Sequence, residues 1–227
     1  MAISEARREE RRQHLIQAAR ALIGRREGAV FSMAQLAAEA GVSPATPYNL
    51  MGGRAEIVRE VIEQDEARFI ARISSSRGAS PLAALLNAAD AVVSHYSADP
   101  SFYRGLYRVE SDNADLQNGM LDRGRALWRR LVSAAIESGE LSASVRVGPL
   151  TELLLRIVVI TTLAWIGGKW GSERFRMELA YGVSMLLAAA ATVKTRNKLL
   201  KSIGAIEAKL DVLADSKSTK RKRIVKE

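Results

Sequence analysis

Apolar residues recur at helical spacing along nearly the whole chain, and few runs of β-branched residues alternate with a period of two. Apolar side chains three or four positions apart form one stripe on a helix, whereas a half-buried strand requires alternation. Hydrophobic residues make up 48% of the 227 residues, which is ample for a substantial core. The pattern therefore predicts an all-α protein.

Breaks between the apolar stripes divide the chain. A Ser- and Gly-rich segment at 74–80 is the best boundary between an N-terminal module and a larger helical bundle. We expect helices at about 4–25, 33–40, 54–73, 81–97, 100–110, 114–138, 149–168 and 173–193, with a short helix after Ser43 and an amphipathic stretch from 194 into the tail.

The net charge of +9 is unevenly placed. The final twelve residues, "SKSTKRKRIVKE", hold six Lys/Arg against one acid, so only +4 remains for the rest of the chain. Like charges without apolar spacing cannot pack, and we expect this tail to be disordered. With no cysteine and no apolar stretch in "MAISEARREERRQHL", the sequence predicts a cytoplasmic protein without disulfides.

The most apolar window, "LLLRIVVITTLAWIGG" at 153–168, is interrupted by Arg156 and ends in two glycines. It is shorter than the roughly 20 apolar residues that a membrane span requires. We interpret it as a buried core or interface helix, and we expect no membrane partner.

The segment "AAEAGVSPATPYNLMGGRAEI" at 37–57 has the pattern of a helix-turn-helix. Ser32 and Gln35 form a capping-box pattern, Gly41 suits the left-handed residue that ends a helix, and Ser43 can cap the next helix with Pro44 at its first position. The alternative is an ordinary corner between two helices.

Polar residues in the short second helix favour DNA binding over a structural corner. Thr46, Tyr48 and Asn49 place hydrogen-bonding groups on its expected outer face, whereas Val42, Leu50 and Met51 can point inward. Arg54 opens the next helix, where the helix macrodipole disfavours a cation unless an external anion such as a phosphate is near.

Residues 15–62 resemble the DNA-binding region of the TetR family of bacterial transcriptional regulators. The matching features are "LAAEAGVS" followed by Thr46, Pro47, Tyr48 and Arg54. The resemblance implies phosphate contacts from Thr46, Tyr48 and Arg54, base-edge contacts from Pro44 and Ala45, and support from Ser32 and Asn49. The expected DNA-binding residues are thus Ser32, Ser43, Pro44, Ala45, Thr46, Tyr48, Asn49 and Arg54.

Two departures from the family pattern affect the expected geometry. Pro47 stands where Leu is usual, removes a helical N–H and disfavours the helical conformation of Thr46, which predicts a distorted first turn. Met51, Gly52 and Gly53 stand where Phe and polar residues are usual, which predicts a flexible elbow before the next helix.

The resemblance also implies an effector pocket in the body, for which the candidate residues are Tyr103, Tyr107, Trp128 and Trp165. The alternative is that these aromatics simply fill the core. The helices at 149–168 and 173–193 are apolar on more than one face, which favours a four-helix dimer interface, with Leu154 and Leu187 as test positions.

No catalytic constellation accompanies His14 or His95, and helix capping is a better interpretation of Glu110, Asp112 and Asp115 than a metal site. No cofactor or enzymatic activity is expected. The sequence thus predicts a ligand-responsive homodimeric repressor that binds double-stranded DNA and a small-molecule effector; an architectural, non-sensing DNA binder is the alternative. The expected domains are a helix-turn-helix domain at 1–53, a connecting helix at 54–73, an effector-binding and dimerisation domain at 74–193, and an extension with a basic tail at 194–227.

Overall fold

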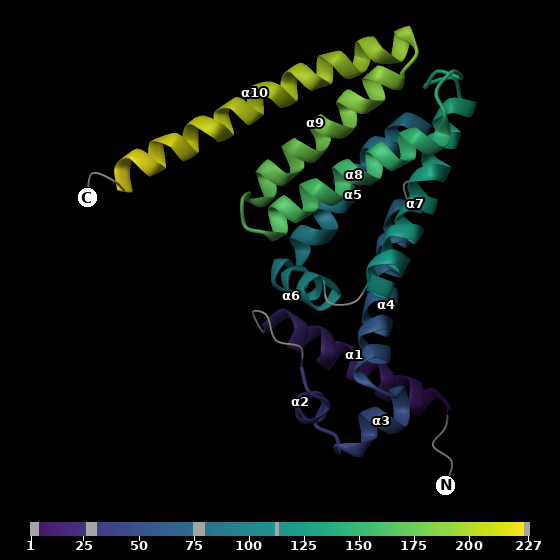
Figure 1. Cartoon of the computed structure of the whole chain (residues 1–227), viewed down its shortest axis with the longest axis vertical. Coiled ribbons are helices and arrows are strands. Elements are labelled where there is room, and N and C mark those ends of the chain that lie inside the picture. The colour runs from purple at the N-terminus through teal and green to yellow at the C-terminus, as the bar shows by residue number, and fades with distance from the viewer. Residues whose placement is uncertain (1–4, 26–30, 75–79, 112–113, 225–227) are drawn as a thin grey trace. The chain divides into compact units, whose positions relative to one another are not determined.

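The computed structural model describes residues 5–25, 31–74, 80–111 and 114–224. Over these residues the chain is helical apart from turns and one isolated bridge between Leu141 and Ala191, so the all-α prediction is confirmed (Figure 1). The helices are α1 (Glu5–Arg25), α2 (Met33–Glu39), α3 (Ala45–Met51), α4 (Arg54–Ser74), α5 (Pro81–Ala98), α6 (Pro100–Ser111), α7 (Ala114–Glu137), α8 (Val147–Ile166), α9 (Ser172–Ala190) and α10 (Val193–Ile224).

The chain forms two compact units, and each joins two separate stretches of the sequence. The first unit joins residues 1–71 to residues 98–120, and the second joins residues 72–97 to residues 121–227. The chain passes from the first unit to the second between residues 71 and 72, close to the Ser- and Gly-rich segment at 74–80. Helix α6, however, belongs with the N-terminal helices.

The first unit is built around α1, which packs against α2, α3 and α6. Its large buried hydrophobic residues come from α1, α2, α4, α6 and the residue Phe31 before α2, and include Leu15, Ile16, Leu22, Ile23, Phe31, Leu36, Ile57, Val61, Ile62, Phe102 and Leu106. Gly105 on α6 allows the closest approach to α1, because a Cβ built there would lie 2.9 Å from the carbonyl carbon of Ile23 and closer still to its oxygen. A side chain at this position would separate the two helices.

A polar cluster joins α1, α4 and the start of α6 inside the same unit. Arg20 Nη1 donates to Asp65 Oδ1 at 2.6 Å, and the hydroxyl of Tyr103 donates to Asp65 Oδ2 at 2.8 Å. Arg20 also lies 3.5 Å from a carboxylate oxygen of Asp99 and 3.6 Å above the centre of the Phe102 ring. These five residues are called the Arg20 cluster below.

The second unit is a bundle in which α9 packs against both α8 and α10 (Figure 1). The Trp165 ring stacks on Phe175 with 5.3 Å between centroids, and Leu154 and Leu187 are fully buried. The carboxylate of Glu140 accepts the backbone N–H of Leu82 at 2.8 Å. Partial burial by itself would raise the pKa of Glu140, but this and other hydrogen bonds outweigh burial and lower it.

The C-terminal helix differs from the disorder expected for residues 216–227. Helix α10 continues through Ile224, and the side chains beyond residue 214 and residues 225–227 lie outside the described residues. Neither Pro nor Gly occurs after Gly204, and Ala, Lys and Arg are good helix formers. Local helix propensity therefore accounts for the continuation, which the charge pattern alone did not predict.

Among the described residues, α8 alone is long and apolar enough to cross a membrane. The core helix of a globular protein can have the same length and apolar composition. Here α8 buries Leu150, Leu154, Leu155 and Trp165 and packs against α9, as expected for a core helix.

Candidate nucleic-acid interface

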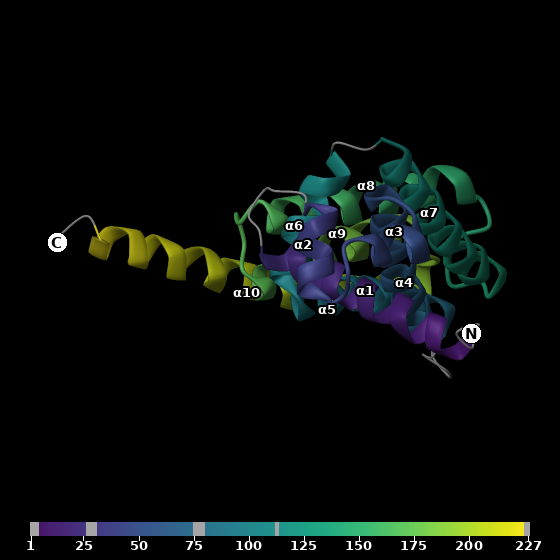
Figure 2. The same cartoon turned by 90° about the horizontal axis from the view of Figure 1, so that it is seen from below.

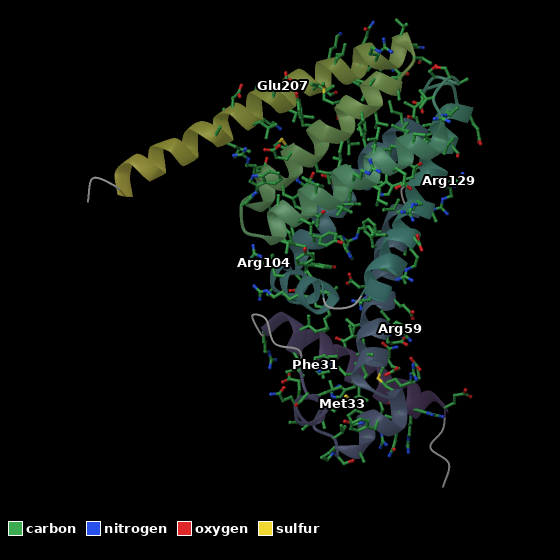
Figure 3. All side chains as sticks on the ribbon, in the orientation of Figure 1. Phe31, Met33, Arg59, Arg104, Arg129 and Glu207 are labelled. Carbon is green, nitrogen blue, oxygen red and sulfur yellow. The ribbon has the colours of Figure 1, made fainter. Side chains whose placement is uncertain are left out.

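The capping box predicted at the start of α2 is confirmed. Ser32 has extended backbone angles, and its hydroxyl oxygen accepts the N–H of Gln35 at 3.2 Å. The Gln35 side-chain oxygen accepts the N–H of Ser32 at 2.9 Å. Phe31 and Met33, which precede and follow Ser32 in the sequence, are labelled in Figure 3.

Gly41 makes the turn between α2 and α3, as predicted. It has φ of 61°, a conformation that strains residues with a Cβ. The N–H of Gly41 donates to Ala38 O and that of Val42 to Ala37 O, which is the pair of bonds of a Schellman motif. The imidazole Nε2 of His14 lies 3.1 Å from Ala40 O and ties this turn to α1.

The start of α3 differs from the prediction in one detail. Pro44, not Ser43, is the N-cap residue, and no side chain caps the helix. The Ser43 hydroxyl instead hydrogen-bonds the Thr46 hydroxyl at 2.7 Å, while Ser43 O accepts the Thr46 N–H at 2.9 Å. The backbone N–H of Thr46 is thus hydrogen-bonded within this tight first turn, without the predicted side-chain cap.

Pro47 does not prevent a helix from forming over Ala45–Met51. It is the third helical residue, and N–H groups in the first turn have no partner within the regular helix pattern. Pro47 is buried, so it occupies the inward-facing place that the family pattern gives to Leu. The predicted distortion is limited to the tight turn before it.

The outward face of α3 carries the residues expected to meet DNA. Ala45, Tyr48 and Asn49 are exposed and share one face by their spacing of three and four, and Tyr48 is 57% exposed. Thr46 is half-buried. Of the remaining candidates, Ser32, Ser43, Pro44 and Arg54 are exposed.

Two hydrogen bonds hold the elbow between α3 and α4, where flexibility was expected. Gly52 has φ of 86°, and its N–H donates to Tyr48 O at 3.0 Å. The N–H of Gly53 donates to Glu56 Oε2 at 3.0 Å. The two glycines thus end one helix and start the next.

Arg54 is exposed at the first position of α4 and pairs with no carboxylate among the described residues. Its charge is unfavourable to the positive end of the helix dipole. An anion bound outside the helix would offset this cost. The guanidinium can bind a phosphate with two parallel hydrogen bonds.

Arg12 is a residue of the site that the pattern did not single out. Its guanidinium donates to Leu50 O at 3.2 Å, near the end of α3, and to Glu60 of α4 at 3.3 Å. Arg12 therefore fixes the position of α3 relative to α1 and α4, although it is not one of the residues expected to contact DNA. Among four arginines close together, nothing in the local sequence distinguishes this one.

The candidate effector residues are divided between the two units. Tyr103 and Tyr107 lie on α6 in the first unit, whereas Trp128 and Trp165 lie in the second. Tyr103 is a buried member of the Arg20 cluster, and burial and then the Asp65 charge raise its pKa. Trp128 and Trp165 are buried and Tyr107 is exposed.

No group of three potential metal-ligating side chains occurs among the described residues. The side chains of Glu110, Asp112 and Asp115 lie outside that set. His95 packs edge-on against Tyr96 at 5.8 Å.

No protein-family profile and no curated relative matches the sequence. Solved structures do match. A TetR transcription regulator from Haloarcula marismortui has a TM-score of 0.71 at 15% identity, covering 81% of this chain and 100% of its own. SmeT, the repressor of the Stenotrophomonas maltophilia multidrug efflux pump SmeDEF, has a TM-score of 0.69 at 16% identity, covering 81% and 92%. A gamma-butyrolactone receptor has a TM-score of 0.64 at 18% identity, covering 89% and 99%.

The chain therefore has the fold of TetR-family transcriptional regulators, and the resemblance expected from residues 15–62 is confirmed for the fold as a whole.

Proposed function

We propose that the chain is a DNA-binding transcriptional regulator whose α3 enters the major groove. The observation that carries this proposal is the exposed face of α3 with Tyr48 and Asn49, set on the Gly41 turn and followed by Arg54. A short helix with so little buried surface has no evident structural use for these polar groups. Helix-turn-helix proteins use such a helix to reach base edges and phosphates.

The finer proposal is a cytoplasmic, homodimeric repressor that responds to a small-molecule effector and has no catalytic activity. Two proteins with this fold, the repressor SmeT and a gamma-butyrolactone receptor, support this proposal. Regulation would act through the spacing of the two recognition helices, because a dimer must match successive major grooves. The effector residues named above stay part of this proposal.

The experiment is selection of preferred duplexes from genomic DNA of the native host, followed by affinity measurements. A regulator is expected to prefer its selected operator over a scrambled duplex by about 10³-fold or more. An architectural protein would show little preference and a steep salt dependence. Little preference would therefore contradict the proposed function.

Replacing Arg54 with Ala is expected to weaken binding to operator and scrambled DNA by a similar factor. Each neutralised phosphate releases close to one counterion, so the magnitude of the salt slope should fall by about 0.9 per half-site. Base preference should survive. Arg59→Ala is the matched control, since Arg59 is also exposed on α4 (Figure 3) and follows by five residues, on another face. Equal salt slopes for Arg54→Ala and wild type would show that Arg54, at the start of α4, does not contact a DNA phosphate.

Dimerisation is expected through α8 and α9, at positions other than those first suggested by the sequence. Leu154 and Leu187 are fully buried within the bundle, so a charge there would unfold the unit. Ile160 is 68% exposed on α8, and Leu153 and Met185 are also exposed. Ile160→Glu should therefore give monomers by sedimentation.

Val212→Glu is the matched control for Ile160→Glu. Val212 is also 68% exposed but lies on α10. The dimer mass should persist in this variant. Monomers from Val212→Glu together with dimers from Ile160→Glu would place the interface on α10.

A further inference from the structure

The first turns of α1 carry three arginines on one face. At about 100° per residue, Arg7, Arg8 and Arg11 fall within an arc of about 100°, because they are spaced by three and four residues. The acidic residues Glu5, Glu9 and Glu10 fall outside this arc by the same geometry. We call Arg7, Arg8 and Arg11 the α1 arginine stripe.

The stripe serves no evident purpose in folding. All three side chains are exposed, and no described residue forms an ion pair or hydrogen bond with them. Arg12 shows the contrast, since its guanidinium bonds Leu50 O and Glu60 and lies 3.7 Å from Glu9. Like charges at such spacing repel each other and weaken a helix unless an anion is near.

Contacts further along α1 show which way the stripe faces. Arg7 and Arg25 are eighteen residues apart, which is five full turns, and Arg25 bonds Glu39 of α2 at 2.9 Å. His14, close to the same direction, contacts Ala40 O at the end of α2. Going around the helix axis from Arg7, the next arginines are Arg11, then Arg8, then Arg12. Arg12 contacts the end of α3. The stripe therefore faces the side of α1 on which the helix-turn-helix lies.

The position of the stripe along α1 is set by Arg12. Its bonds place the second turn of α1 beside the last turn of α3 and the start of α4. Figures 1 and 2 both show the N-terminal end of α1 next to these two elements. The stripe thus extends the exposed surface of α3 with three cations.

We propose that the α1 arginine stripe binds the phosphate backbone of duplex DNA next to the segment that α3 contacts. This inference rests on the proposed DNA-binding function and extends its surface to DNA that flanks each half-site. Charge complementarity carries it, since each guanidinium presents a planar fork that fits a phosphate. The contact is independent of base sequence, because phosphates carry no sequence information.

The experiment is a salt titration of a triple variant, Arg7→Ala, Arg8→Ala and Arg11→Ala, against the selected operator and a scrambled duplex. The magnitude of the salt slope is expected to fall by about two to three per protomer on both duplexes, with base preference unchanged. The matched control removes the same charge elsewhere: Arg129→Ala, Arg130→Ala and Lys194→Ala, at exposed positions of the second unit. The control should keep the wild-type slope. A triple variant whose slope equals that of the control would overturn the inference.

Two further arms separate the possible causes. A triple Arg→Lys variant should keep the slope, because it keeps the charge. A triple Arg→Gln variant removes the charge as the Ala variant does, and it reports the effect if the Ala variant folds poorly. Trimming the base pairs that flank the operator should weaken wild type but not the Ala variant; equal weakening of both would also overturn the inference. Wild type that binds both duplexes equally would contradict the proposed regulator, while the slopes would still test the stripe.

Discussion

Replacing Asp65 with Ala is expected to lower the free energy of unfolding by about 3–5 kcal/mol, because it leaves a partly buried guanidinium with only the more distant and more exposed carboxylate of Asp99. Asp65 is 6% exposed, and its two carboxylate oxygens accept from Arg20 and from the Tyr103 hydroxyl. Burial by itself would lower the pKa of Arg20, but the hydrogen bond and charge of Asp65 outweigh burial and raise it. The carboxylate thus supports a cation that would otherwise be costly to enclose.

Chemical denaturation of three variants separates the charge effect from simple loss of packing. Arg20→Met with Asp65→Leu should recover much of the stability, since replacing both members of a buried ion pair by apolar residues is often tolerated. Tyr103→Phe should cost only about 1 kcal/mol, as for one lost hydrogen bond. If Asp65→Ala costs no more than Tyr103→Phe, the Arg20 cluster does not hold α1, α4 and α6 together.

Local chemistry made the helix-turn-helix predictable. The Ser32–Gln35 capping box and the left-handed Gly41 act between residues at most five positions apart, so a short window contains all the information. The same window misplaced the cap of α3, because Pro44 takes the cap position and the Ser43 hydroxyl bonds Thr46. Competing local hydrogen bonds of similar energy cannot be ranked from the amino-acid sequence alone.

Contacts between distant residues were not predictable in this way. Arg20 and Asp65 are 45 residues apart, and neither differs in its local pattern from the other charged residues of α1 and α4. The grouping of α6 with the first unit has the same origin, since a glycine in an apolar stripe does not show which helix it will approach. Composition indicated a break at 74–80 but not which elements would pack together across it.

When a helix is apolar on two faces, the periodicity of its sequence does not show which face is buried inside the bundle. Helices α8 and α9 were expected to be covered on several sides, yet the pattern did not separate positions inside the bundle from those outside it. Leu154 is fully buried and Ile160 is largely exposed, although both belong to the same apolar run. The packing of the neighbouring helices α5, α7 and α9 against α8 decides between them.

Gly105→Ala is expected to destabilise the first unit by about 3 kcal/mol or more, at or above the upper end of ordinary overpacking. The new methyl group would meet the backbone of Ile23, and a helix backbone cannot rotate away as a flexible side chain can. Helix α6 would have to move off α1, which would also loosen Phe102 over Arg20. The midpoint of chemical denaturation, followed by circular dichroism, measures the effect.

Gly204→Ala is the matched control, because Gly204 lies within α10 and nothing is within 4 Å of a Cβ built there. The same substitution should stabilise that helix by about 0.5–1 kcal/mol, through the better helix propensity of Ala. Opposite signs for the two substitutions would show that close approach of α1 and α6, rather than helix propensity, decides the outcome at Gly105. A stabilising Gly105→Ala would mean that α6 does not approach α1 as closely as the structure has it, and the grouping of α6 with the N-terminal helices would lose its main support.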